Sequence, residues 1–96
     1  MNWDSPLDPI VITVAEVAAG LRPVLVVTHD DGHGGWQLLD GAAAPGRRPV
    51  VIPKVEALRI DPTIAEVADL PSGWRARRTA VGAPWLREPN PDSESG

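Results

Sequence analysis

The sequence contains no cysteine, phenylalanine or tyrosine, and Lys54 is its single lysine. The absence of cysteine excludes disulfide bonds and thiolate chemistry, and it removes the usual clue to the redox compartment. The only aromatic residues are four tryptophans. We expect Trp36 and Trp74 to pack in the core, because the chain has few other large side chains to bury. Trp3 in the N-terminal segment and Trp85 near the C-terminus are predicted to contact a partner.

The chain also lacks the positive charge that nucleic acids and anionic membranes attract. Its 96 residues carry a formal net charge of −4, with a pI near 4.9. A mildly acidic chain of this length indicates one domain that binds neither nucleic acid nor membrane. The N-terminus has no basic region followed by an apolar core, and no apolar run is long enough to span a membrane, so we expect a cytoplasmic protein. The preference for arginine over lysine, with abundant alanine, proline and glycine, indicates a GC-rich bacterial genome.

Two apolar runs around a glycine-rich turn form the most informative stretch. Residues 24–27 (VLVV) and 36–39 (WQLL) flank residues 30–35 (DDGHGG). An Asp-Gly pair between apolar runs predicts a β-hairpin. If Asp31-Gly32 forms a two-residue turn, Val27 lies opposite Trp36, and one face of the hairpin carries the core side chains Leu25, Val27, Trp36 and Leu38. The three glycines leave a longer loop, with another register, as the alternative.

The remaining elements are short. Further strands are expected at 10–12, as a short edge strand, and at 50–52, 74–81 and 85–87. Thr13 and Glu16 have the spacing of a capping box at the start of a short helix that ends at Gly20. A second helix is expected with Pro53 in its first position, and a third after an Asp61 N-cap with Pro62 in its first turn.

This order of elements predicts an α+β fold. We expect a mostly antiparallel sheet of four to five strands, with two or three short helices packed on one face. Residues 10–88 form the single domain. Residues 1–9 are expected to be an extended lead-in, and residues 89–96 a disordered tail.

Chemistry-bearing side chains cluster in two places, of which the hairpin turn is the first. His29, Asp30 and His33 are metal-ligand types within five residues. However, the glycines place them on a turn, where Asp and Gly also serve the turn itself. No phosphate-binding glycine loop and no activated nucleophile accompany them. For these reasons a metal-binding protein or a small metal-dependent enzyme using this turn is kept only as the alternative hypothesis to a binding module. No cofactor is expected.

The second cluster is the arginine-rich strand. Period-two alternation places Arg75 and Arg77 on one face, opposite Trp74, Ala76 and Arg78. Arg75 and Arg77 suit an anion or an acidic partner, because guanidinium groups bind carboxylates and phosphates, although such a face is often simply solvated. Arg78, on the core side, needs a carboxylate or a helix C-terminal carbonyl as its partner.

Three motifs carry a family resemblance across residues 23–88. They are GGWQLLDG, VVIPKVEALRIDPTIAEVADLPSGWRARR and APWLRE. The chain resembles a family of small uncharacterised bacterial proteins that share a W-Q hairpin, a D-P helix and an L-P-x-G-W segment. More distantly it is similar to immunity-type proteins of bacterial toxin systems. The resemblance implies no catalytic residue.

We therefore predict a non-enzymatic protein-binding module, immunity-like or regulatory. It is expected to bind another protein through Arg75, Arg77, Trp3 and Trp85. Homodimerisation through an unpaired sheet edge is a further arrangement that the sequence allows.

Overall fold

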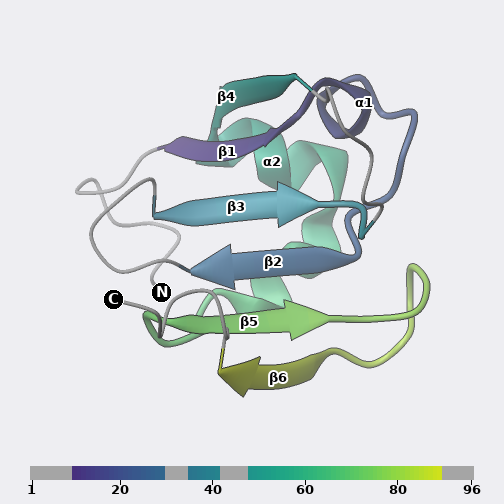
Figure 1. The fold of residues 1–96 in the computed structure, drawn as a ribbon. Coiled ribbons are helices and arrows are strands. Elements are labelled where there is room, and N and C mark those ends of the chain that lie inside the picture. Colours follow the sequence, from purple (N-terminus) through teal and green to yellow (C-terminus); the bar gives the residue numbers. More distant parts are fainter. Residues whose placement is uncertain (1–9, 30–34, 42–47, 90–96) are drawn as a thin grey trace.

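The computed structural model describes residues 10–29, 35–41 and 48–89. The expected lead-in with Trp3, the tail after Pro89, and Asp30 and His33 of the turn lie outside these ranges. In chain order the elements are β1 Ile10–Val14, α1 Ala15–Ala18, β2 Val26–His29, β3 Trp36–Leu39, β4 Pro49–Pro53, α2 Lys54–Ile60, the 3-10 helix η2 Pro62–Val67, β5 Trp74–Arg77 and β6 Leu86–Pro89 (Figure 1). No helix within the described ranges is long and apolar enough to cross a membrane.

The six strands form one mixed sheet in the order β4-β1-β3-β2-β5-β6. The predicted α+β fold with a mostly antiparallel sheet is confirmed, but the count of four to five strands is wrong. β1 and β3 pair in parallel, whereas every other neighbouring pair is antiparallel. Residues 10–12 are not an edge strand either, because β1 lies between β4 and β3. The β2–β3 hairpin is placed with β3 beside β1, and this produces the parallel pair.

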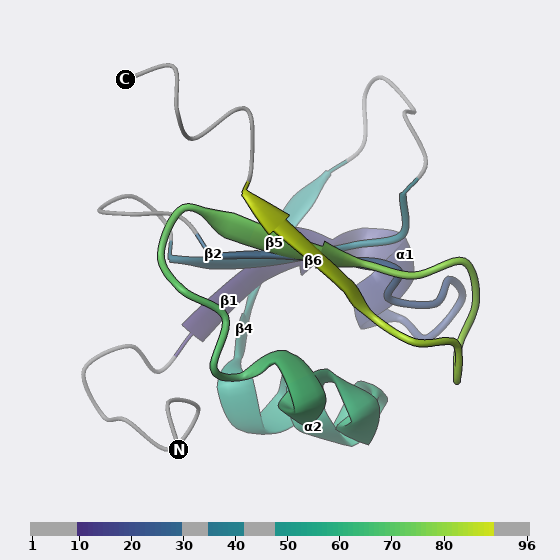
Figure 2. The ribbon, with the colours of Figure 1, turned by 90° about the horizontal axis from the view of Figure 1, so that it is seen from below.

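One face of the sheet is covered by α2 and the η2 turn, as Figure 2 shows. Alternate residues of the strands point into this layer and make the core with the helical residues, because side chains alternate across a sheet. The buried apolar side chains are Val11, Val17, Val24, Val27, Trp36, Leu38, Ile52, Ala57, Ile64, Val67, Ala68, Leu70 and Ala76. Trp36 is thus a core residue as predicted, and Trp74 packs against the same core while partly buried.

The hairpin register differs from the preferred prediction by two residues. Val27 pairs with Leu38, and His29 pairs with Trp36, so Val27 does not lie opposite Trp36. Residues 30–35 separate the last paired residues, and the longer loop is therefore the correct alternative. Because the shift is an even number, Val27, Trp36 and Leu38 keep the core face. The observed register also stacks the His29 ring on the Trp36 ring, with centroids 4.1 Å apart and planes 9° apart.

Of the three predicted helix starts, one is confirmed and two differ from the prediction. Pro53 is the N-cap of α2 rather than its first residue. Thr13 belongs to β1 and donates its hydroxyl to the Leu38 carbonyl at 2.7 Å, so no capping box forms with Glu16. The Thr13 hydroxyl is buried, so leaving it without an acceptor would cost free energy. An exposed helix amide can bond to water instead. Asp61, in contrast, is the N-cap of η2 and accepts a hydrogen bond from the Thr63 amide at 3.0 Å.

Prolines limit hydrogen bonding at the free edge of β4. The Ala15 amide donates to the Arg48 carbonyl in register with the β1–β4 pairing. Along an antiparallel edge strand, residues bonded to the neighbouring strand alternate with residues whose backbone N–H and C=O groups point away from the sheet. Pro49, Val51 and Pro53 are at the outward-pointing positions. Since proline has no N–H, Val51 supplies the single outward donor of this strand.

The other free edge, β6, follows the same rule. The Arg78 amide donates to the Leu25 carbonyl, which fixes the alternation along β5. Through the β5–β6 register, Leu86 and Glu88 bond to β5, while Arg87 and Pro89 point outward. Arg87 is therefore the single outward donor of β6. Both edges are poorly suited to pairing with another strand.

Candidate functional site

The face of the sheet opposite α2 and η2 carries no helix in the described part of the chain (Figure 2). Strand registers place six side chains in a row across it, from one edge to the other: Val51, Ile12, Gln37, Thr28, Arg75 and Glu88. A second row adds Leu39, Val26, Arg77 and Leu86. We call this surface the open face, defined by these ten side chains.

Apolar side chains lie at the β4 end of the first row and at the β6 end of the second row. Val51 is 58% exposed and Leu86 is 51% exposed, although both lie in strands. Between them, Ile12, Val26 and Leu39 are half-buried. Removing exposed apolar side chains such as these from water lowers the free energy.

Arg75 and Arg77 lie together on the open face, as the alternation predicts, and share one carboxylate. The Nε atoms of Arg75 and Arg77 lie 2.6 and 2.9 Å from the same Glu88 Oε2. These hydrogen bonds, first from Arg75 and then from Arg77, hold the pKa of Glu88 below its usual value. Among the described residues, the terminal amino groups of both guanidiniums have no hydrogen-bond partner. Two cations and one anion leave this cluster with one excess positive charge.

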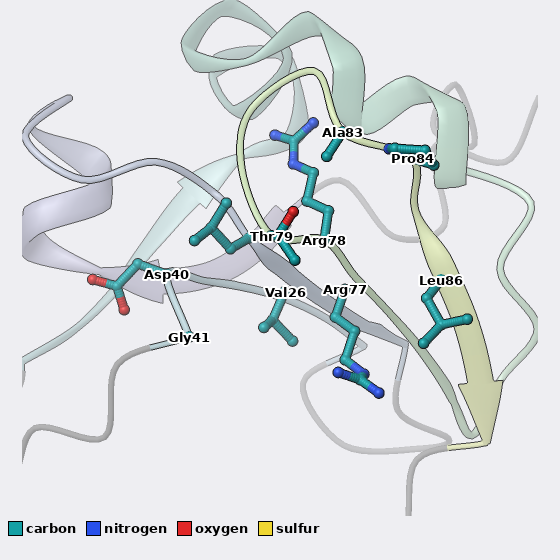
Figure 3. A pocket seen from close by; sticks show the side chains of 10 residues that line it. Val26, Asp40, Gly41, Arg77, Arg78, Thr79, Ala83, Pro84 and Leu86 are labelled. Carbon is teal, nitrogen blue, oxygen red and sulfur yellow. The ribbon is translucent and has the colours of Figure 1, made fainter.

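A pocket of about 550 Å³ lies beside this cluster, where β3 and β5 end and β2 and β6 begin. We call it the Arg77 pocket, lined among others by Leu25, Val26, Asp40, Arg77, Pro84 and Leu86. Figure 3 shows Val26, Arg77 and Leu86 pointing away from the helices. The Asp40 carboxylate points away from Arg77 (Figure 3) and is 3.0 Å from the Arg22 Nε, with its side chain 2% exposed.

Arg78 also lines the pocket, but its guanidinium points toward the helices (Figure 3). Its Nη2 atom lies 2.6 Å from Asp61 Oδ2, and the Arg78 side chain is 1% exposed. It also donates to the Val24 carbonyl at 2.8 Å and to the Thr63 hydroxyl at 2.9 Å. The prediction that Arg78 is buried against a carboxylate is confirmed.

The predicted site residue Trp85 is not part of the open face. The centre of its ring lies 4.1 Å from the Arg78 guanidinium carbon, and it packs against the core while partly buried. The structure therefore separates Trp85 from Arg75 and Arg77, which the sequence had grouped with it. Leu86 and Glu88, which follow it in β6, take its place beside the arginines.

His29 of the candidate metal turn is directed into the protein. Its Nδ1 lies 2.7 Å from the Leu70 carbonyl oxygen, so Nδ1–H is the donor, since a carbonyl can only accept. Stacking on Trp36 holds the ring in this position. In the described ranges, no three His, Cys, Asp or Glu side chains are grouped as metal ligands. Asp30 and His33 lie outside those ranges.

Sequence reasoning missed Glu88 and the pocket walls. Glu88 is one of several acidic residues near the C-terminus, and only the β5–β6 register places it between Arg75 and Arg77. The residues that line the pocket come from four separate segments of the chain, so no local sequence pattern predicts the pocket.

The chain matches no protein-family model, no curated protein and no solved structure. Its resemblance to small bacterial proteins and to immunity-type proteins stays a prediction.

Proposed function

We propose that this protein is a non-enzymatic module that binds another protein through its open face. The observation that supports the proposal is the set of exposed and half-buried apolar side chains in the two rows, next to a cluster with one excess positive charge. All of them lie on the side of the sheet that carries no helix in the described part of the chain. Apolar side chains and arginine together are typical of protein interfaces. An immunity-like or regulatory role in a bacterial cytoplasm is the role we propose for the module.

The free edges favour recognition through side chains. A partner that adds a strand to a sheet needs backbone donors along the edge. β4 and β6 each offer one outward N–H, because Pro49, Pro53 and Pro89 supply none. A homodimer formed by edge pairing is disfavoured for the same reason.

The charges beside the Arg77 pocket favour binding over catalysis. Glu88 is held by two arginines, which lower its pKa and make it a weak base. Asp40 is bonded to Arg22. A general base needs a pKa near the working pH and a free path to a proton, and Glu88 lacks the first of these.

The test is affinity capture from the lysate of the source cell, read by quantitative mass spectrometry. The tagged wild type is compared with Val51→Asp on the open face and with Val55→Asp on α2. Val51 and Val55 are 58% and 66% exposed, so the control matches the test variant in chemistry and exposure. We expect a protein that is retained by wild type and Val55→Asp and lost with Val51→Asp. Equal retention by both variants, or no retained protein, would contradict the proposal.

A further inference from the structure

The Arg77 pocket lies at one end of the open face, next to the excess positive charge of the Arg75, Arg77 and Glu88 cluster. Resting on the proposed function, we propose that this pocket binds an extended acidic segment of the partner. An apolar side chain of that segment enters the pocket, and a neighbouring carboxylate binds the Arg77 guanidinium.

The shape and walls of the pocket fit an apolar side chain. Its volume of about 550 Å³ lies within the range of sites that hold organic groups. Leu25, Val26, Pro84 and Leu86 provide apolar walls, and Leu86 is 51% exposed. An apolar group placed there removes these walls from water, which provides the non-directional part of the binding free energy.

The charges around the pocket select an anion. Asp40 is paired with Arg22, and Arg78 is paired with Asp61, so these four charges cancel in pairs. Among the described residues, Arg75 and Arg77 share the single carboxylate of Glu88, and both bind its Oε2 atom. Arg77 is therefore the charged group at the pocket that has hydrogen-bonding capacity to spare among the described residues.

Arg77 is also placed to use that capacity. Its side chain is 52% exposed, and its Nε is already bonded to Glu88, which limits the freedom of the guanidinium. A planar guanidinium held in this way presents its terminal amino groups in the geometry that a carboxylate accepts. A carboxylate next to the apolar anchor thus meets a preorganised donor.

A second copy of this chain is a poorer occupant than an acidic segment. In a two-fold contact the same patch meets itself. The excess positive charge of one copy would then face that of the other, and like charges oppose association. Charge complementarity therefore points to a partner that is acidic at this spot.

The test is selection of dodecapeptides from a random phage-displayed library on immobilised wild-type protein. Enriched peptides are expected to carry Asp or Glu beside Leu, Ile, Val or Met. One enriched peptide is then synthesised with a fluorophore and titrated by anisotropy. Arg77→Gln is expected to weaken binding roughly tenfold, as for the loss of one hydrogen bond to a charged group. Arg59→Gln, another exposed arginine paired with one glutamate, is the control and is expected to stay within about twofold.

Other outcomes overturn the inference. These are a selection that enriches nothing, enriched peptides without acidic residues, and an unchanged affinity in Arg77→Gln. Self-association of the wild type that Arg77→Gln abolishes would also overturn it, because the occupant is then a second copy. If a lysate partner is lost with Val51→Asp and kept with Arg77→Gln, the proposed function stands and the acidic-segment inference fails.

Discussion

The buried ion pair between Arg78 and Asp61 should dominate the stability of the helix-covered side of the sheet. Arg78 is 1% exposed and Asp61 is 12% exposed, and their atoms are 2.6 Å apart. Asp61→Asn removes the negative charge but retains an oxygen that accepts from the Thr63 amide, because asparagine is as good an N-cap as aspartate. The guanidinium is then left as a buried charge without a counter-ion.

Such a loss costs about 3 kcal/mol of unfolding free energy, at the lower end for buried pairs because Asp61 keeps some contact with solvent. In a domain of this size, 3 kcal/mol lowers Tm by about 12 to 24 °C. Urea unfolding followed by tryptophan fluorescence measures the free energy directly. The variant Arg78→Met and the double variant complete a cycle, in which we expect a coupling of about 2 kcal/mol.

Asp69→Asn is the matched control. Asp69 forms a similar ion pair with Arg87 at 2.8 Å, but the two side chains are 72% and 39% exposed. We expect a loss below about 1 kcal/mol, since solvent screens exposed pairs. If Asp61→Asn costs no more than Asp69→Asn, burial does not strengthen this pair, and the reasoning is refuted.

Two further predictions concern the sheet and its turns. Glu88→Gln should lower the unfolding free energy at pH 7. The difference from wild type should shrink as pH falls below 4.5 and should vanish below the lowered folded-state pKa, because the carboxylate stabilises only while it is ionised. Urea unfolding between pH 7 and pH 3 tests this, and a difference that does not change with pH would contradict it. Gly73→Ala should lower the unfolding free energy by about 1 to 2 kcal/mol in the same assay. Gly73 has a φ of +84° and no neighbouring atom crowds the added methyl group, so the cost is backbone strain. Ser72→Ala should lie within about 0.5 kcal/mol of wild type, and equal effects of the two substitutions would argue against strain.

Local patterns in the sequence predicted the features that depend on local chemistry. The Asp61-Pro62 pair marks a helix start, and the period-two alternation places Arg75 and Arg77 opposite Arg78. The alternation also predicts that Arg78 needs a carboxylate or a helix C-terminal carbonyl as its partner. It does not show which residue binds Arg78, because Asp61 is 17 residues away in the chain.

Features decided by distant contacts were not predictable in this way. Asp31-Gly32 favours a two-residue turn, but His29 gains a stacking contact with Trp36 and a hydrogen bond to Leu70 when the loop is longer. Likewise, no local signal in β1 shows that its neighbour β3 runs parallel to it.

The candidate site also has a part that local sequence patterns predict and a part that depends on distant contacts. Arg75 and Arg77 were identified from their own strand, and the structure adds Glu88 as their shared carboxylate. The Arg77 pocket needs the ends of several strands in one place, which is a property of the sheet order.

The prolines at the sheet edges also disfavour open-ended assembly. A molecule that associates edge to edge always presents another edge, so growth continues into fibres. With one outward N–H on β4 and one on β6, that route is weak at both ends. Association through the open face uses a surface of which each molecule has one. Complexes of this protein should therefore close at a fixed stoichiometry and saturate on titration, even at high concentration.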